Sequence, residues 1–130
     1  MKCVSIPQPW AWAILAGVQR SEYRCYPTEH RGDLLIHAVR GSGDWERRQL
    51  AVLGERVPRW ENLPFDQVLG VVELLSCEQG RDGEWIWELR NPRPIEPFRL
   101  EAGKGLFEVN DEQVRPLPAN GNGGKKKRKK

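Results

Sequence analysis

The first forty residues of the chain alternate between short apolar runs and breaks at proline or glycine. Residues 2–6 are rich in β-forming residues and predict a first strand. An apolar run over residues 10–16 follows Pro9 and stops at Gly17, residue types common at the start of a helix and just past its end. The pattern therefore predicts a strand followed by one short helix.

The rest of the chain carries further runs of β-prone residues. Five more strands are expected, over residues 22–26, 33–38, 68–76, 85–89 and 105–109. Side chains alternate along a strand, so Trp85, Trp87 and Leu89 should share one face and form part of the core or barrel wall. Gly70 indicates a bulge or a close approach of another segment.

Prolines follow the strand expected over residues 85–89. Pro92, Pro94 and Pro97 lack the backbone N–H that a β-ladder requires. We therefore expect regular pairing to stop there and an extended crossing segment to lead to the last strand.

Residues 44–57 place apolar side chains at helical spacing among charged ones. A second, amphipathic helix is expected there, with Ser42 or Asp44 as its N-cap and Gly54 as a weak point. Short strands with two interposed helices, and no regular βαβ alternation, indicate the α+β class. The expected architecture is a small mixed β-barrel with two flanking helices.

The chain has 130 residues, 38% hydrophobic and 30% charged, as is typical of one globular domain. Beyond Pro118, a linker rich in Gly and Asn leads to a basic C-terminus: Lys125, Lys126, Lys127, Arg128, Lys129 and Lys130. We expect an ordered domain over residues 1–117 and a flexible, disordered tail over residues 118–130.

Charge is distributed unevenly along the chain. The formal net charge is +3, but without the six basic tail residues there are 15 basic residues against 18 acidic ones. Affinity for polyanions is therefore expected mainly from the tail. A binding site in the body has to be a local group of residues rather than a broad basic face.

Features of several protein classes are missing from the sequence. No run reaches the roughly 18 apolar residues of a membrane span and the N-terminus does not resemble a signal peptide, so a cytoplasmic protein without membrane contact is expected. Cys3, Cys25 and Cys77 show no CxxC spacing and no HExxH motif occurs, so no metal is expected. Gly41-Ser42-Gly43 lacks the rest of a dinucleotide loop or a P-loop, so no cofactor is expected either.

One segment has a recognisable spacing of charged residues. Residues 17–24, Gly-Val-Gln-Arg-Ser-Glu-Tyr-Arg, resemble the GxKxxExR signature of the ASCH domain family, relatives of the PUA domains of RNA-modifying enzymes. Four further blocks agree in chain order with a common bacterial branch of that family: Ser5-Ile6-Pro7-Gln8-Pro9-Trp10-Ala11, Arg31-Gly32-Asp33-Leu34-Leu35-Ile36-His37-Ala38, Gly70-Val71-Val72-Glu73-Leu74, and Asn91-Pro92-Arg93-Pro94 leading to Gly105-Leu106-Phe107.

The resemblance implies a PUA-like barrel with a cleft between the signature loop and the SxxQPWA segment, proposed in the family to bind RNA or a nucleobase-like ligand. Some small ASCH proteins are amidohydrolases that remove acyl groups from modified cytidines, using the signature lysine with a carboxylate. Gln19 replaces that lysine here, and an amide is neither a nucleophile nor a base at neutral pH. A binding module is therefore expected rather than an enzyme.

Residues in and around the signature provide the chemistry that recognition of a base requires. Trp10 offers a stacking surface, Glu22 can accept hydrogen bonds from an exocyclic amine, and Arg24 can donate to a phosphate or a ring acceptor. RNA or a nucleoside-like compound is the expected partner. The candidate ligand-binding residues are Ser5, Gln8, Trp10, Gln19, Glu22, Arg24 and His37.

Other interpretations of the same residues stay open. Glu22 and Arg24 point to one side of a strand and could form a structural ion pair, and His37 at the end of an apolar strand could serve the fold alone. A buried Glu73 would need a partner, for which Arg24 is the obvious candidate. The alternative functions are a small hydrolase of N4-acylated cytidine-type nucleosides, with Glu22 or Glu73 as acid or base, and a protein-interaction domain.

Deletion of residues 119–130 should weaken nonspecific RNA binding and flatten its salt dependence, because the tail holds six positive charges and the body is net negative. Folding should be unchanged, since a Gly/Asn linker adds nothing to a core. RNA affinity measured at several salt concentrations checks this, with thermal unfolding as the control. Equal affinities and equal salt slopes for the two chains would contradict this role of the tail.

Overall fold

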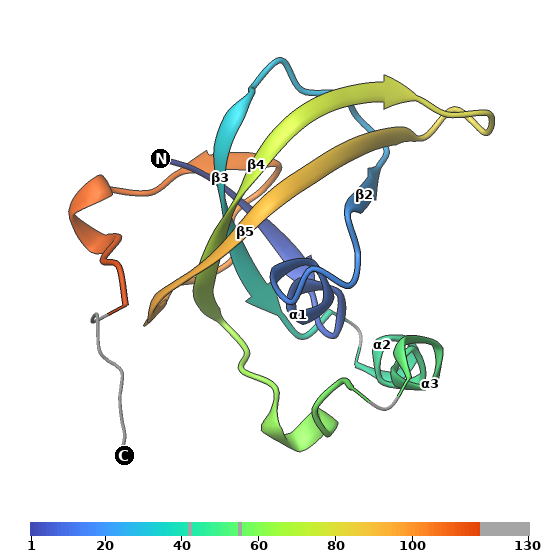
Figure 1. Ribbon diagram of the computed structural model, residues 1–130, viewed down its shortest axis with the longest axis vertical. Coiled ribbons are helices and arrows are strands. Elements are labelled where there is room, and N and C mark those ends of the chain that lie inside the picture. Colours follow the sequence, from blue (N-terminus) through green and yellow to red (C-terminus); the bar gives the residue numbers. More distant parts are fainter. Residues whose placement is uncertain (42, 55, 118–130) are drawn as a thin grey trace.

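The computed structural model describes residues 1–41, 43–54 and 56–117, and its main feature is one mixed β-sheet (Figure 1). The strands are β1 (Lys2–Pro7), β2 (Ser21–Arg24), β3 (Gly32–Val39), β4 (Gln67–Gln79), β5 (Trp85–Arg99) and β6 (Leu106–Glu108). The helices are α1 (Trp10–Leu15), α2 (Asp44–Arg48) and α3 (Leu50–Leu53), with 3-10 turns over Trp60–Asn62 and Asp111–Gln113. Each predicted strand and the first predicted helix are present, with shifted ends.

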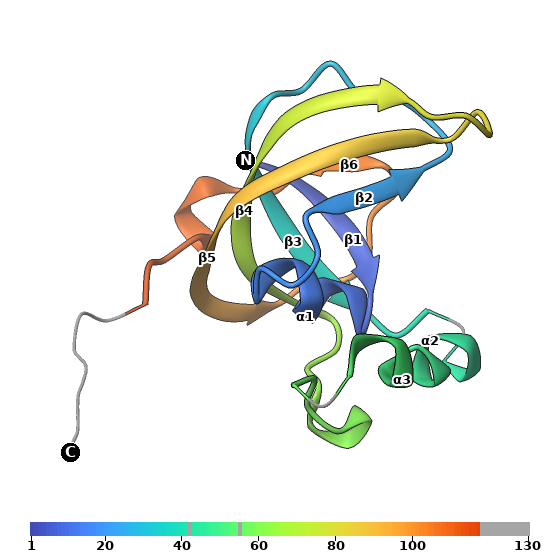
Figure 2. The same cartoon turned by 45° about the vertical axis from the view of Figure 1, so that its right-hand side comes forward.

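The strands form one sheet in the order β2-β5-β4-β3-β1-β6. β1 and β3 run parallel, with α1 and β2 in the connection between them, whereas the other neighbouring strands are antiparallel. Figures 1 and 2 show that the sheet curls into a half-barrel and that α1 lies across one of its ends. The expected α+β class and the curled mixed sheet are confirmed.

Apolar side chains are buried on both faces of the sheet. Ala11 and Ile14 of α1 belong to a cluster with alternate residues of β1, β3, β4 and β5. Trp87 is fully buried in this cluster, and Trp85 and Leu89 pack in it as well, so their predicted place in the barrel wall is confirmed. The second cluster consists of Cys3, Leu35, Val68, Val71, Ile95 and Val109.

The expected unpaired crossing segment is wrong, although the pairing at the prolines is irregular, as expected. β5 continues to Arg99 and pairs with β4 over this length, with register shifts that interrupt the ladder. The edge of β5 that faces away from β4 pairs with β2 at residues 85–88. After residue 88, no strand of the sheet lies beside this edge. Apart from the contact of Ile95 and Glu96 with residues 115–116, that edge carries no ladder that a missing proline N–H would break.

The predicted amphipathic helix over residues 44–57 is also wrong. Two short helices replace it, and their apolar side chains stay outside the core, with Val52 71% exposed and Trp45 51% exposed. The buried residue of α2 is Glu46, which is charged. Helical spacing of apolar residues does not bury a face when no core surface lies opposite it.

The ends of these helices also differ from the expectation. α2 gives way to α3 at Gln49, and α3 ends at Gly54, whose φ of +86° favours glycine. The N-cap of α2 is Gly43 rather than Asp44. The other predicted cap, Ser42, lies outside the described residues.

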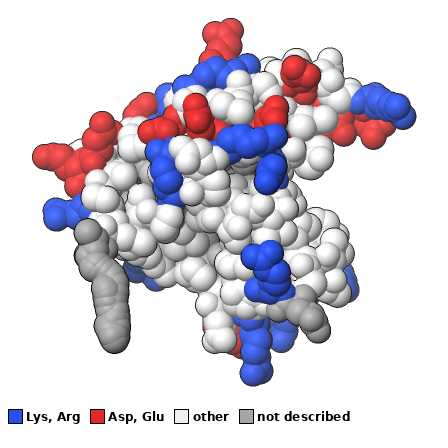
Figure 3. Space-filling model, in the orientation of Figure 1, with Lys and Arg blue, Asp and Glu red and all other residues white. Residues whose placement is uncertain are grey.

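The predicted basic tail, over residues 118–130, also lies outside the described residues, so the domain boundary at residue 117 stays a prediction. On the face shown in Figure 3, acidic and basic side chains are interspersed over the upper part, whereas the lower part carries mainly basic ones. Within the described ranges, none of the helices has the length and apolar character that crossing a bilayer requires.

Gly70→Ala should destabilise the fold. The predicted close approach at Gly70 is confirmed, because a Cβ atom there would lie 2.6 Å from Leu15 Cδ2 and 2.8 Å from the carbonyl oxygen of Arg93. Such overpacking typically lowers the free energy of unfolding by about 1–3 kcal/mol. Denaturant unfolding is the measurement, with Leu75→Ala, at a solvent-exposed position of the same strand, as the control. A loss no larger than that of the control would mean that this contact tolerates a methyl group.

Candidate functional site

The signature loop, residues 17–20, is held between the end of α1 and the edge of β5. The backbone N–H of Gln19 donates to the carbonyl oxygen of Ala13 at 3.1 Å. The carbonyl oxygen of Arg20 accepts the N–H of Leu89 at 2.8 Å. These bonds fix the loop between two neighbouring cavities.

The first cavity has a volume of about 310 Å³ and is the one we call the aromatic cavity. Its lining residues are Ile6, Pro7, Trp10, Gln19, Glu22, Tyr23 and Trp45. Tyr23 and Trp45 are 59% and 51% exposed, so their rings stand at the rim. Three aromatic residues therefore line the same cavity as one carboxylate.

Glu22 is the charged group of the aromatic cavity. Its side chain is buried, and Oε2 accepts a hydrogen bond from Arg24 Nη1 at 2.9 Å. Burial raises the pKa of the Glu22 carboxyl above its ordinary value, although the hydrogen bond and the charge of Arg24 act in the opposite direction. The ionised form of Glu22 therefore depends on Arg24.

Arg24 lies behind Glu22 and connects the cavity to the core. Nη2 donates to the Tyr26 hydroxyl at 3.1 Å, and Nη1 reaches the carbonyl oxygen of Ser5 at 3.4 Å. The guanidinium carbon lies 5.5 Å from the ring centroid of Tyr26 and 5.8 Å from that of Trp87, within cation–π range. Arg24 does not line the aromatic cavity, so its contribution there is to hold Glu22 in place.

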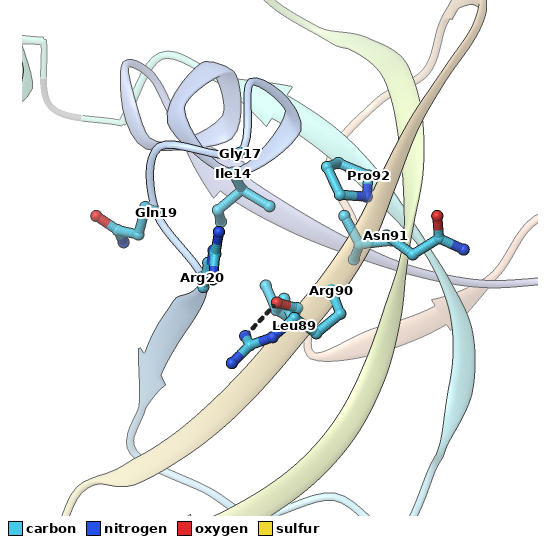
Figure 4. Close-up of a pocket in the computed structure, with 9 residues that line it drawn as sticks. Ile14, Gly17, Gln19, Arg20, Leu89, Arg90, Asn91 and Pro92 are labelled. Carbon is cyan, nitrogen blue, oxygen red and sulfur yellow. Dashed lines mark hydrogen bonds between the residues drawn. The ribbon is translucent and has the colours of Figure 1, made fainter.

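The second cavity, of about 230 Å³, lies between α1 and the edge of β5 (Figure 4). We call it the arginine cavity. Its lining residues are Ile14, Gly17, Gln19, Arg20, Val72, Leu89, Arg90, Asn91 and Pro92. Gln19 lines both cavities, so the two meet at this residue.

Only part of the predicted ligand-binding set comes together. The members that line the aromatic cavity are Trp10, Gln19 and Glu22. Gln8 is instead fully buried: its Nε2 donates to the carbonyl oxygen of Pro64 at 3.0 Å, and its Oε1 accepts the N–H of Trp12 at 2.9 Å. The amide thus ties the first turn of α1 to the segment before β4, so the structure gives Gln8 a structural place rather than one in the cavity.

Ser5 and His37 lie on the other face of the sheet. Ser5 Oγ is 2.8 Å from His37 Nδ1, His37 Nε2 is 2.5 Å from the carbonyl oxygen of Leu100, and the imidazole packs edge-on against Phe107. A carbonyl oxygen only accepts, so Nε2 carries the proton and Nδ1 accepts from Ser5. Burial lowers the pKa of His37, which favours this neutral form. The structure does not bring these two residues to the cavity.

Glu73 lies in β4, opposite Asp33 on one side and Arg90 on the other. It is half-buried rather than buried, and Arg24, the candidate partner of a buried Glu73, is bonded to Glu22 instead. The two carboxylates considered for a hydrolase therefore do not line one cavity. Across the described residues, no group of three or more His, Cys, Asp or Glu side chains could hold a metal ion.

The family model of the ASCH domain matches residues 4–99 of the chain, a stretch that includes the signature loop and every lining residue of both cavities. This chain belongs to the ASCH domain family. The narrower assignment to a bacterial branch stays a prediction.

The ASCH domain described here resembles one part of larger proteins. It is 31% identical to activating signal cointegrator 1 of Homo sapiens and 23% identical to that of Mus musculus. Each match covers 85% of this chain and 22% of the relative. The chain therefore spans less than a quarter of the length of these relatives.

A solved ASCH protein has the same fold. The crystal structure of ASCH from Zymomonas mobilis aligns with a TM-score of 0.59 at 18% identity, covering 86% of this chain and 89% of that one. Two single-residue variants of that protein align with TM-scores of 0.58. The expected PUA-like, α+β fold of an ASCH domain is therefore confirmed.

Sequence reasoning missed several cavity residues. Side chains alternate between the two faces of a strand, so Tyr23 is expected on the face opposite Glu22. It nevertheless lines the aromatic cavity, because β2 is the edge strand at which this cavity opens. Trp45 lies in a segment expected to pack on the core, but the short α2 leaves its ring at the rim. Arg20 and Arg90 are far apart in the chain, and only the contact of the signature loop with β5 joins them.

The pH dependence of stability should differ between the wild type and Glu22→Gln. Because burial raises the pKa of Glu22 above its ordinary value of 4.5, the folded state binds this proton more tightly than the unfolded state. The tighter proton binding of the folded state stabilises the fold. This stabilisation is fully present below the ordinary pKa of Glu22 and is lost as pH rises through the raised pKa. Relative to the variant, the wild type should therefore lose stability over this range, as measured by denaturant unfolding at a series of pH values. Parallel pH profiles for the two proteins would contradict the raised pKa.

Proposed function

We propose that this ASCH domain binds RNA or a nucleoside by holding one base in the aromatic cavity. The observation that carries the proposal is a buried carboxylate, Glu22, that lines one cavity together with Trp10, Tyr23 and Trp45. Proteins bind unstacked bases by stacking on aromatic rings and by hydrogen bonds to the base edges. Membership of the ASCH family supports the same function, because the match includes the signature loop.

The side chains that line the aromatic cavity can make different types of contact with a base. Trp10 and Trp45 offer stacking surfaces, which contribute about 1–3 kcal/mol per base. Glu22 accepts hydrogen bonds from a base edge, because its bonds to Arg24 and to the backbone of Tyr23 occupy only two of the roughly four lone-pair sites of a carboxylate. Gln19 donates through Nε2 to the carbonyl oxygen of Ser21 at 2.9 Å, and no described residue bonds its amide oxygen, which is available as an acceptor.

The size of the cavity also favours a small ligand. At about 310 Å³, it lies at the lower end of the range of about 300–1,000 Å³ for ligand pockets. A single base suits this volume better than a folded RNA element does. The rest of an RNA strand would then pass over the protein surface.

Binding without turnover is the better-supported activity. A hydrolase of acylated cytidines would need a nucleophile or base beside Glu22, and the residue in that place is the amide Gln19. Glu73 does not line the cavity. Multiple-turnover release of acyl groups from an N4-acylated cytidine would overturn this part of the proposal. The cytoplasmic location and the nucleic-acid role of the tail stay predictions.

Trp10→Ala should weaken binding of a nucleoside or RNA by roughly 1–3 kcal/mol through lost stacking, and Trp10→Phe by less, because a smaller ring remains. Glu22→Gln should cost about as much, since it keeps the shape and removes the charge that accepts hydrogen bonds. Affinity and melting temperature are measured on the same proteins. Trp12→Ala, on the same helix but outside both cavities, is the control.

A purely structural role for these residues predicts another pattern. Both substitutions would then lower the melting temperature, by loss of the ion pair or by a new void, while the folded fraction bound as tightly as the wild type. That result would place the site elsewhere. If nucleosides and RNA all failed to bind while a protein partner co-purified, the interaction-domain alternative would replace the proposal.

A further inference from the structure

Base binding in the aromatic cavity leaves the neighbouring arginine cavity without a role. The floor of the arginine cavity is formed by the buried side chains Ile14, Val72 and Leu89. Arg20 and Arg90 line the same cavity and are more exposed, so they form its rim. The aromatic cavity, in contrast, has no arginine or lysine among its lining residues.

Hydrogen bonds bring the two arginines to one edge of β5. Arg90 Nη1 donates to the carbonyl oxygen of Leu89 at 2.8 Å, so the guanidinium folds back over that edge. The N–H of Leu89 points to the same edge and donates to the carbonyl oxygen of Arg20 at 2.8 Å. Figure 4 shows Arg90 extending toward the side where Arg20 lies, while the amides of Gln19 and Asn91 point away from the other labelled side chains.

Both guanidinium groups keep N–H donors for a ligand. Arg90 uses one of its five donors on the Leu89 carbonyl oxygen and another in a short charge-assisted bond to Glu88. Arg20 is exposed, and its side chain makes no hydrogen bond or ion pair with any other described residue. With Glu88 included, the rim carries one net positive charge. Planar donors above an apolar floor favour an oxyanion such as phosphate.

We propose that the arginine cavity binds the phosphate attached to the nucleotide whose base occupies the aromatic cavity. This inference rests on the proposed function and adds the class of ligand, a phosphate ester rather than a free nucleoside. Because Gln19 lines both cavities, one ligand can reach Glu22 and the two arginines from opposite sides of this residue. The phosphate can belong to a mononucleotide or to an RNA backbone, which present the same chemistry.

The test compares the four common ribonucleosides, their 3′- and 5′-monophosphates and a short mixed-sequence RNA, each titrated into the full chain. Phosphate should tighten binding about tenfold, the gain expected from a charge-assisted hydrogen bond. Arg20→Gln should abolish this gain and leave nucleoside affinity unchanged, because Arg20 does not line the aromatic cavity. Arg81→Gln, at an exposed position between β4 and β5, removes the same charge elsewhere and should leave the gain intact.

The outcomes separate the two proposals. Monophosphates that bind no more tightly than nucleosides, together with an RNA affinity equal in the wild type and Arg20→Gln, would overturn the phosphate site and leave base binding standing. A monophosphate gain that Arg20→Gln leaves intact would overturn it as well. If no nucleoside, nucleotide or RNA binds, the proposed function fails and the phosphate site fails with it. A loss of affinity in Arg20→Gln supports the site. A loss seen with monophosphates indicates a mononucleotide ligand, and a loss seen with RNA alone indicates an RNA strand.

Discussion

The arrangement of the site depends on the ion pair between half-buried Arg24 and buried Glu22. The Arg24 guanidinium lies between the Glu22 carboxylate and the rings of Tyr26 and Trp87. Because Trp87 is fully buried, these contacts tie the one charged group of the aromatic cavity to the barrel wall. Removing one partner of a buried ion pair leaves the other charge uncompensated, which typically costs about 3–5 kcal/mol. The stability of the half-barrel and the geometry of the cavity are therefore coupled through one side chain.

The two cavities share one loop because the fold attaches that loop at both ends. Residues 17–20 are bonded to α1 on one side and to β5 on the other. Aromatic rings and a carboxylate gather on one side of Gln19, and two guanidinium groups gather on the other. A nucleotide has the same separation of a base from a charged phosphate. A rigid frame of strands thus positions a binding loop whose two sides differ in chemistry.

Local patterns predicted the elements that the core requires. The strands and α1 follow from apolar runs bounded by proline and glycine, and Gly70 was correctly expected at a close approach. The same reasoning failed at the prolines of β5, because it could not know that the edge facing them has no partner strand. It failed again over residues 44–57, because helical spacing does not reveal whether a core surface lies opposite.

The sequence by itself determined the family, the α+β class and three residues of the aromatic cavity, since spacing along a loop and a strand is a local property. Only the tertiary structure decided that Gln8 and His37 are bonded within the scaffold, because their partners Pro64 and Leu100 are more than fifty residues away in the chain. The arginine cavity is likewise a product of the contact between the signature loop and β5. A side chain's chemistry is set by its type, but its availability to a ligand depends on which distant groups it has already bonded.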